Sequence, residues 1–230
     1  IQQLATQSDV VLSYEPSGEK GGFITGTSGI AYVEALVHGK SAHAGVAPEA
    51  GVNAMTEAAD LILRTQDIQD RSKERGFNWT MIKAGTANNI IPDLATVNAD
   101  VRYGRNEDLE LMEGQLAERA QKTRLPGARV EVKVTRGRPA YNATAEGKVV
   151  MQKAIDIYQE VGGQMQINDI RGGGGSDAAY AALSGKPVVE GLGLPGANYH
   201  TNDAEYVVTT AIARRLYLSA RLVSELGQGL

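Results

Sequence analysis

The sequence contains no cysteine, few histidines and few aromatic residues. Its 230 residues include no Cys, three His and 5% Phe, Trp and Tyr. The absence of cysteine excludes disulfide bonds, so a metal site would have to be built from His, Asp and Glu side chains. Only His38, His43 and His200 can supply an imidazole ligand.

The sequence also lacks a long apolar run and an excess of positive charge. No apolar run approaches the roughly 18–20 residues of a membrane-spanning helix, so no membrane partner is predicted. A net charge of −4 and a pI near 5.5 argue against a nucleic-acid partner, which usually requires a basic face. The chain begins at Ile1, without an initiator Met or a signal peptide, which indicates a piece of a longer polypeptide whose N-terminal segment is missing. The compartment, periplasm or cytoplasm of a bacterium, stays open.

The middle of the chain shows strand and helix periodicities in a regular order. Period-two alternation predicts strands over 30–37, 77–81, 95–101 and 130–134. Two amphipathic helices are predicted between them. The first follows the first strand and has its apolar face predicted at Val52, Met55, Ala59, Ile62 and Leu63. The second carries Leu109, Met112, Leu116 and Ala120. The order β-α-β-β-α-β is that of a ferredoxin-like α+β domain, which we place at residues 28–139.

The flanking segments have α/β texture. A buried strand is predicted over 9–14, and the glycine-rich stretch GGFITGTSG after it is interpreted as a loop at a domain boundary. Helices are predicted over 146–161 and 177–184, then an apolar strand, PVVEGL, and a final helix that holds Ile212, Leu216, Ala220 and Val223. The simplest architecture is an α/β domain, formed by 1–27 and 140–230, that carries the ferredoxin-like domain as an insertion.

Several polar residues occur where chemistry is often found, and each has an ordinary interpretation as well. Glu15 ends a strand and His200 lies in a loop after one, so both suit metal binding, but either can simply be a solvated turn residue. The stretch RGGGGSD is typical either of a helix cap by Ser or Asp or of an anion cradle. In the middle domain, Asn89 can be a turn residue, and Arg102 can be a solvated charge or a bidentate partner of a substrate carboxylate.

Six segments of the sequence together resemble a known protein family, although none of the residues discussed above indicates that family by itself. They are SYEP, GKSAHAGVAPEAGVNA, NNIIPDLATVNADVRY, RGRPAYNA, GGGGSDAAYAALSGKP and GLGLPGANYHTNDAEYV. In their order and spacing they resemble the aminoacylase/glutamate-carboxypeptidase family of two-zinc hydrolases, and the resemblance covers essentially the whole chain.

The resemblance implies a role for each matching position. Glu15 and His200 match metal ligands, one for each of two Zn²⁺ ions per subunit. The middle domain matches the family's dimerisation domain, whose histidine, here His43, reaches into the partner subunit's site to polarise the scissile carbonyl. Further matching positions contact the substrate's free carboxylate or line its pocket: Asn89, Arg102, Arg138, Gly174 and Gly175. His38 matches no functional position and is expected to be an exposed strand residue.

The implied function is zinc-dependent hydrolysis by a homodimer. The substrate is a small molecule or peptide with a free carboxylate, from which a C-terminal amino acid, glutamate, is released out of an N-acyl or folate-type conjugate. The remaining metal ligands and the general base of the family have no match here, so the piece alone is expected to be inactive. The alternatives are an aminoacylase or desuccinylase acting on other N-acyl amino acids, or a non-catalytic dimerisation module.

Overall fold

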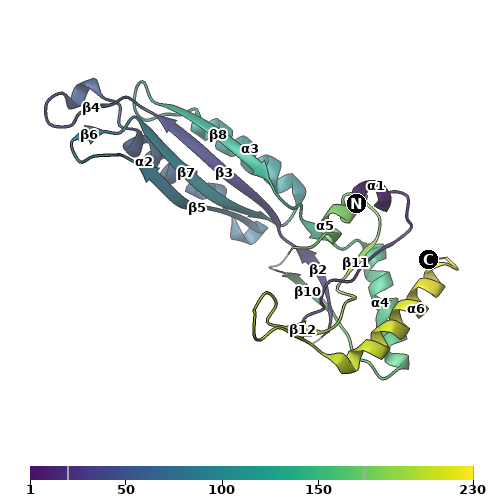
Figure 1. Cartoon of the computed structure of the whole chain (residues 1–230). Helices are drawn as coiled ribbons and strands as arrows, with labels where there is room; N and C mark the ends of the chain where they lie inside the picture. Colours follow the sequence, from purple (N-terminus) through teal and green to yellow (C-terminus); the bar gives the residue numbers. More distant parts are fainter. Residues whose placement is uncertain (20, 173–174, 230) are drawn as a thin grey trace. The chain divides into compact units, whose positions relative to one another are not determined.

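Figure 1 shows a computed structural model of the chain, which describes residues 1–19, 21–172 and 175–229. The chain divides into two compact units. Unit 1 consists of Ile1–Ser28 and Ala140–Leu230, and unit 2 is the continuous segment Gly29–Pro139. The fold is a mixture of α and β structure, and the chain leaves unit 1 once, builds unit 2 and returns.

Unit 2 is built on a four-stranded antiparallel sheet in the order β5-β7-β3-β8. Along the chain its elements are β3 (Gly29–His38), β4 (Ala42–His43), α2 (Ala54–Thr65), β5 (Arg75–Ala84), β6 (Ile90–Ile91), β7 (Leu94–Tyr103), α3 (Asn106–Ala120) and β8 (Arg129–Arg136), with short 3-10 turns at Pro48–Ala50, Gln66–Ile68 and Arg71–Lys73. This strand order with two crossing helices is the ferredoxin-like arrangement, so the predicted fold class is confirmed.

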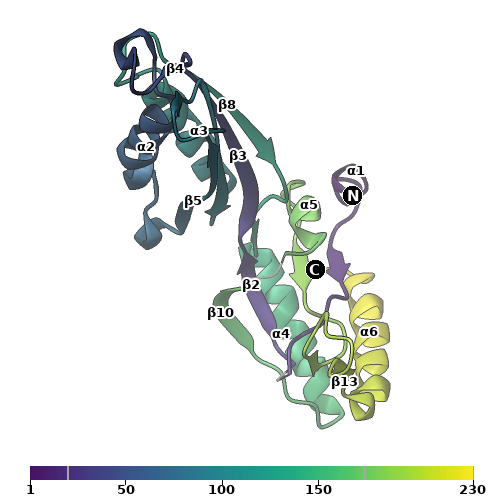
Figure 2. The ribbon, with the colours of Figure 1, turned by 60° about the vertical axis from the view of Figure 1, so that its left-hand side comes forward.

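One face of this sheet is covered and the other is open. Helix α2 packs against β3 and β7, and α3 packs against β7 and β8, so both helices lie on the same side, as Figure 2 shows. Alternate residues of β3 and β7 point into that layer and are buried: Ala31, Val33, Ala35, Val37, Ala95, Val97, Ala99 and Val101. Residues of the opposite parity, such as Tyr32 and Asp100, lie on the uncovered face.

Helix α2 begins at a capped end and buries an unexpected face. The Asn53 side chain accepts hydrogen bonds from the backbone N–H groups of Met55 and Thr56, which satisfies two donors of the first turn. The predicted apolar face was wrong, because Met55 and Leu63 are exposed and the buried face runs through Leu61 and a carboxylate. That buried face consists of Ala54, Glu57, Ala58, Leu61 and Thr65.

Glu57 is tolerated in the core because both oxygens of its carboxylate have partners. It forms an ion pair of 2.9 Å with Arg64 and accepts hydrogen bonds from the backbone N–H groups of Arg124 and Leu125 at 2.9 and 2.8 Å. A buried charge with such partners ties the helix to the loop before β8. In α3, by contrast, the predicted face of Leu109, Met112, Leu116 and Ala120 is confirmed as buried.

Among its described residues, unit 1 distributes its strands over three small sheets. They are the parallel pair β1 (Val11–Ser13) and β11 (Val188–Glu190), the three-stranded sheet of β10 (Ile167–Gly172), β2 (Phe23–Thr27) and β9 (Tyr141–Asn142), and the hairpin of β12 (Gly196–Ala197) and β13 (Tyr206–Val207). The helices of the unit are α1 (Gln2–Ala5), α4 (Ala145–Glu160), α5 (Ala178–Ala182) and α6 (Ile212–Leu226), the last preceded by a 3-10 turn at Thr209–Ala211.

The core of unit 1 lies between its strands and the helices α4 and α6. Phe23 is fully buried there, together with Val150, Leu192 and Leu218. The stretch GGFITGTSG is therefore not a loop as predicted, because its central residues form β2 and Phe23 anchors that strand in the core. Within the described residues, no helix combines the length and apolarity needed to cross a lipid bilayer.

Candidate functional site

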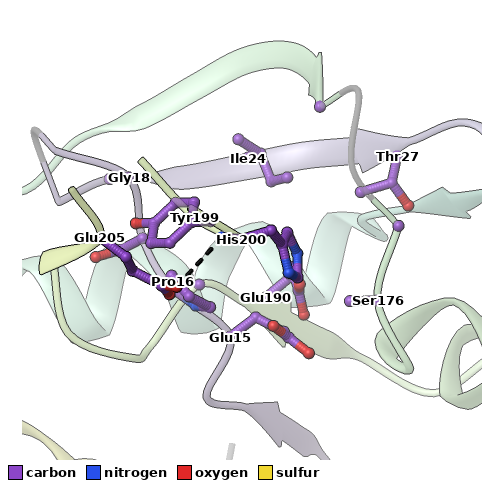
Figure 3. A pocket seen from close by; sticks show the side chains of 15 residues that line it. Glu15, Pro16, Gly18, Ile24, Thr27, Ser176, Glu190, Tyr199, His200 and Glu205 are labelled. Atoms are coloured by element: carbon purple, nitrogen blue, oxygen red, sulfur yellow. Dashed lines mark hydrogen bonds between the residues drawn. The ribbon is translucent and has the colours of Figure 1, made fainter. Parts of the chain in front are cut away.

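A cavity of about 440 Å³ opens in unit 1 where the parallel strands β1 and β11 end. The strand register pairs Ser13 with Glu190, so the segments that follow the two strands lie at one edge of the pair. Ligands of α/β proteins commonly bind at the carboxyl ends of parallel strands. Figure 3 shows Glu15, Glu190, His200 and Glu205 around this cavity. Its size is that of a small-molecule site.

The structure brings Glu15 and His200 to the wall of the same cavity, although 185 positions separate them in the sequence. His200 lies in the loop between β12 and β13 with a left-handed backbone, φ 67°. Its N–H donates to Glu205 Oε2 at 3.2 Å across the loop, as the dashed line in Figure 3 shows. Left-handed backbone is uncommon for residues other than glycine and is concentrated at functional sites.

The segment that carries Glu15 is fixed from two sides. The Glu15 carbonyl accepts a hydrogen bond of 3.0 Å from the N–H of Gly193, and a Cβ at position 193 would lie only 2.5 Å from the Tyr14 carbonyl oxygen. On the other side, Arg215 Nη2 donates to Ser17 Oγ at 3.0 Å. The position of the Glu15 backbone therefore depends on a glycine in one loop and on an arginine in α6.

Arg215 is buried, and the cost of burying its charge is partly offset by an aromatic ring. Its guanidinium carbon lies 4.9 Å from the centre of the Tyr158 ring in α4, a cation–π distance. Burial lowers the pKa of Arg215, with the Tyr158 side chain acting in the opposite direction. The residue thus connects α4 and α6 to the loop at the cavity rim.

Two further carboxylates at the cavity were not predicted as site residues. Glu190 is buried at the end of β11, and Glu205 holds the His200 loop. Burial, and secondarily the Glu190 carboxylate, raise the pKa of the Tyr141 hydroxyl, which donates to the Val188 carbonyl at 2.9 Å. The signal for Glu190 was its position in PVVEGL, where a carboxylate interrupts an otherwise apolar strand.

The donor set of this cavity suits a zinc ion in type but is incomplete in number. Carboxylate oxygen and imidazole nitrogen are ordinary zinc ligands, and a zinc site uses at least three protein ligands. Among the described residues, no three His, Cys, Asp or Glu side chains are arranged so as to hold a metal ion. Glu15 and His200 therefore fit as two ligands of a centre that needs others.

The glycine stretch also borders the cavity. Gly175 and Ser176 line it, whereas the predicted site residue Gly174 lies outside the described residues. Ser176 Oγ accepts a hydrogen bond of 3.1 Å from the N–H of Ala178, which begins the five-residue helix α5. The residue before α5 is Asp177, whose side chain makes no capping hydrogen bond, so the first turn is met instead by this contact with Ser176.

In unit 2, the structure brings His43 and Asn89 together. Strands β4 and β6 pair His43 with Ile90, and the Asn89 carbonyl accepts a hydrogen bond of 2.9 Å from the N–H of Ala44. Both side chains are exposed. His43 Nδ1 accepts from the N–H of Gly45 at 3.2 Å, so a neutral imidazole here carries its proton on Nε2. The outward nitrogen is then a hydrogen-bond donor.

Arg102 and Arg138 lie near each other at another part of unit 2. Ile30 of β3 is the register partner of Arg102, and its N–H donates to the Arg138 carbonyl at 2.8 Å. The Arg138 carbonyl also accepts a hydrogen bond of 3.1 Å from the Tyr103 hydroxyl. The Nε of the Arg138 side chain has no hydrogen-bond partner among the described residues. Arg102 and the backbone of Arg138 thus lie at one end of the sheet.

The pair His43 and Asn89 is far from the pair Arg102 and Arg138 within one copy of unit 2. The strand connections to β4 and β6 leave β3 at His38 and enter β7 at Leu94, eight residues along the ladder from Ile30 and Arg102. Eight residues of strand span about 26 Å. One unit 2 cannot bring Asn89 and Arg102 to the same carboxylate.

The sequence is similar to known peptidases and to a known domain family. Residues 25–128 match the family described as the peptidase dimerisation domain M20_dimer. Over all 230 residues the chain is 56% identical to carboxypeptidase G2 of Pseudomonas sp. (strain RS-16), of which it covers 55%. Over 63% of its length it is 31% identical to a Haemophilus influenzae homolog of a p-aminobenzoyl-glutamate hydrolase component, covering 32% of that protein.

Solved structures show the same fold. The aminopeptidase PepT of Bacillus cereus aligns with a TM-score of 0.78 at 28% identity, covering 96% of this chain and 58% of that one. The chain thus spans about half the length of its first curated relative and of this structure. The similarity includes both units, because it extends over nearly all of the chain.

Proposed function

Because the chain belongs to the M20 peptidase family, the family of carboxypeptidase G2, we propose that the protein containing it is a zinc-dependent carboxypeptidase releasing glutamate from N-acyl or folate-type conjugates. The observation that carries this proposal is the 56% identity over all 230 residues. The name of the Haemophilus relative, a homolog of a p-aminobenzoyl-glutamate hydrolase component, supports glutamate as the released amino acid.

Glu15 and His200 would each hold one of two Zn²⁺ ions, with the other ligands coming from residues outside this chain. When bound, zinc supplies Lewis acidity and lowers the pKa of a water molecule towards neutrality. The residues of this chain set the geometry: the Gly193 and Ser17 contacts fix the Glu15 backbone, and Glu205 fixes the His200 backbone. Both ligands lie in the wall of the cavity that would hold the scissile bond.

His43 would donate a hydrogen bond to the carbonyl oxygen of the scissile bond. The Nδ1 contact with Gly45 leaves Nε2–H facing outward, which is the tautomer this role requires. A donor aimed at the developing oxyanion typically supplies about 3–4 kcal/mol of transition-state stabilisation. We propose that His43 serves the site of a partner subunit, and that Asn89 accompanies it because the two lie side by side on β4 and next to β6.

Arg102 and Arg138 would hold the free carboxylate of the substrate, and Gly174 and Gly175 would line the pocket that receives it. A guanidinium forms two parallel hydrogen bonds with a carboxylate, which fixes both position and orientation. The ladder of about 26 Å between Arg102 and the end of β7 that leads to Asn89 supports contacts from different subunits if both residues reach one substrate. Selection for a C-terminal carboxylate then follows from the arginine pair.

Unit 2 would form the homodimer through an exposed helix or edge strand. Its outermost strand β5 lies at one edge of the sheet, and the apolar side chains of Met81 and Ile82 are half exposed on it. A two-fold interface places the same patch of both subunits in contact, so an edge strand can pair with its own copy.

The proposal is tested with the full-length protein prepared with zinc. We expect rapid glutamate release from p-aminobenzoyl-glutamate and folate, loss of activity on chelation, and recovery on adding zinc. N-acetyl derivatives of apolar amino acids and N-succinyl-diaminopimelate serve as competitors in the same panel. Preferential hydrolysis of either would replace the proposal with the aminoacylase or desuccinylase function, and inactivity towards all of them would support a non-catalytic module.

The 230-residue chain alone supplies a matched comparison. Two ligands do not make the coordination sphere of a zinc site, so we expect weak zinc binding and no glutamate release from this piece. Equilibrium dialysis with zinc and a glutamate assay measure both. Robust release by the piece would show that it contains a complete site.

A further inference from the structure

Arg102 is held by a neighbouring carboxylate on the open face of the sheet. Asp100 and Arg102 are two residues apart on β7, so their side chains lie on the same face of the strand. Arg102 Nε donates to Asp100 Oδ1 and Nη2 donates to Oδ2, each at 2.8 Å. The pair is bidentate, and its hydrogen bonds raise the pKa of Arg102.

The geometry decides which part of the guanidinium remains available. An arginine carries five N–H groups, one on Nε and two on each terminal nitrogen. Asp100 occupies the edge formed by Nε and Nη2. The opposite edge, formed by Nη1 and the second N–H of Nη2, points away from Asp100, and it is the edge that can bind a second carboxylate through two parallel bonds.

The surroundings leave that edge reachable. The Arg102 side chain is 41% exposed, and it borders a hollow on the uncovered face together with Tyr32 and Asn78. Both of these residues are register partners of Asp100, in β3 and β5. The residue opposite Arg102 in β5 is Gly76, which places no side chain beside the guanidinium.

We propose that Asp100 is a positioning residue: it holds the guanidinium of Arg102 by one edge and so presents the other edge to the substrate carboxylate. The proposal rests on the proposed function, in which Arg102 binds that carboxylate. An unheld arginine would sample many rotamers, and ordering it on binding would cost conformational entropy. An arginine already held by Asp100 avoids that cost, which is the usual advantage of a preorganised site.

A competing role for Asp100 makes the opposite prediction. If Asp100 merely competed with the substrate for Arg102, its removal would free the guanidinium and strengthen carboxylate binding. If Asp100 positions Arg102, its removal weakens binding. The sign of the change therefore separates the two roles.

The test uses Asp100→Ala and Asp100→Asn in the full-length protein. For N-benzoyl-glutamate we expect KM to rise about tenfold in Asp100→Ala, as for the loss of a hydrogen bond to a charged group, with kcat changed little. Asp100→Asn keeps one acceptor, so its KM should rise by a smaller factor. The α-carboxamide of the same substrate should show no change in either variant, because it lacks the α-carboxylate that Arg102 would bind.

Calorimetric titration with glutarate gives a readout independent of hydrolysis. We expect glutarate affinity to fall in the order wild type, Asp100→Asn, Asp100→Ala. Glu131→Gln is the matched control, since Glu131 pairs with Arg129 two residues away on β8 of the same sheet and loses the same charge. Its KM and glutarate affinity should equal those of wild type.

The outcomes separate this inference from the proposed function. A wild-type protein that hydrolyses N-benzoyl-glutamate, with Asp100 variants that bind glutarate equally well or better, overturns the inference alone. A wild-type protein that binds glutarate in an Asp100-dependent manner without hydrolysing the conjugate supports the inference and overturns the function. Equal loss for the acid and its carboxamide would show a general structural role and would also overturn the inference.

Discussion

The two units of the chain differ in how they use their strands. Unit 2 has one main sheet in which β3 and β7 pair over ten residues, and its helices cover one side of it. In the part of unit 1 that the structure describes, the strands form three small sheets joined by long connections, and the cavity is lined largely from those connections. Unit 2 is thus a rigid platform for the side chains it presents, whereas unit 1 carries Glu15, His200 and Glu205 on loops that other residues must hold.

The largest expected effect tests whether the two units act in different subunits. In the full-length enzyme, His200→Ala removes a proposed metal ligand from unit 1, and His43→Ala removes a proposed oxyanion donor from unit 2. Each homodimer should be nearly inactive. Mixing them with subunit exchange makes about half of the dimers heterodimers, each with one intact site, so roughly a quarter of wild-type activity should return.

Glutamate release measures that recovery, and differently tagged subunits verify the exchange. Mixing two independent preparations of His200→Ala is the control and should restore nothing. Absence of recovery in verified heterodimers would place His43 in its own subunit's site or outside catalysis.

The second prediction concerns the free energy of unfolding of each unit. If the two units unfolded together, the contrast drawn between them would not hold for their stability. Phe23→Ala in unit 1 should lower stability by about 3–5 kcal/mol, and Leu61→Ala in unit 2 by about 2–5 kcal/mol, because both side chains are fully buried. Native-state hydrogen exchange on the chain should show lost protection confined to the unit that carries the change.

Leu63→Ala is the matched control for the second variant, since Leu63 lies in the same helix and is 62% exposed. It should leave protection in α2 nearly unchanged. Equal loss of protection in both units from either core variant would show one cooperative body.

A smaller effect sharpens the assignment of carboxylate binding to unit 2. Arg102→Lys keeps the positive charge but loses the planar fork, both towards Asp100 and towards the substrate. We expect kcat/KM for N-benzoyl-glutamate to fall about 10- to 100-fold. The α-carboxamide of the substrate, already poor, should lose little more. Equal factors for the two substrates would show that Arg102 is a purely structural residue.

The smallest effect uses pH to probe an ion-pair cluster in unit 2. Burial acts to raise the pKa of Asp108, but hydrogen bonds from Arg105 and Arg75 outweigh it and lower the pKa below its ordinary value. A lowered folded-state pKa stabilises the protein above the unfolded-state pKa, and this contribution is lost as pH falls through the folded-state value.

Asp108→Asn should therefore cost about 1–2 kcal/mol at pH 7 and progressively less below about pH 4. Urea unfolding at pH 7, 5 and 3 measures the difference. Glu118→Gln, which removes an exposed partner of Lys122, is the control and should not shift the midpoint at any of these values. A deficit independent of pH would contradict the electrostatic account.

The contrast between the units also explains what could be predicted from the sequence. In unit 2, the strict alternation of β3 and β7 reports a sheet buried on one side, because each side chain's face follows from parity alone. The alternation predicted for Phe77, Trp79 and Met81 was wrong at its end. A bulge between Trp79 and Met81 shifts the register, so Met81 is exposed, and no local pattern announces an extra residue in a strand.

The positions of the helices could be predicted from the sequence, but the faces that they bury could not always be predicted. In α6 the predicted residues Ile212, Leu216, Ala220 and Val223 are all exposed, and the buried face contains Arg215, Leu218 and Leu222. The sequence marks an arginine as polar, whereas the burial of Arg215 is made tolerable by partners far away in the chain, the Tyr158 ring and the Ser17 hydroxyl. The burial of Glu57 in α2 was likewise not predictable, because its partners include the backbone N–H of Arg124, 67 residues away in the sequence.

In the candidate site, too, some residues could be predicted from the sequence and others could not. The roles of Glu15 and His200 followed from a resemblance, and their meeting in one cavity depends on the pairing of β1 with β11, which local sequence does not specify. Glu190 was missed because it lies inside an apolar strand, and Asp100 because a charge on a strand face is ordinarily solvated. Glu190 influences Tyr141, which lies far away in the sequence, whereas Asp100 pairs with Arg102 on its own strand.

The left-handed backbone at His200 has a consequence for how this protein can change. Glycine adopts φ 67° without steric penalty, whereas a residue with a Cβ pays about 1 kcal/mol or more. A library screened only for heat resistance should therefore enrich glycine at position 200, and every such clone would lose the imidazole. Substitutions meant to stabilise this loop should therefore keep His200. They should be made around Glu205, which accepts a hydrogen bond from the His200 N–H, or Asn198, which donates one to the Ala204 carbonyl.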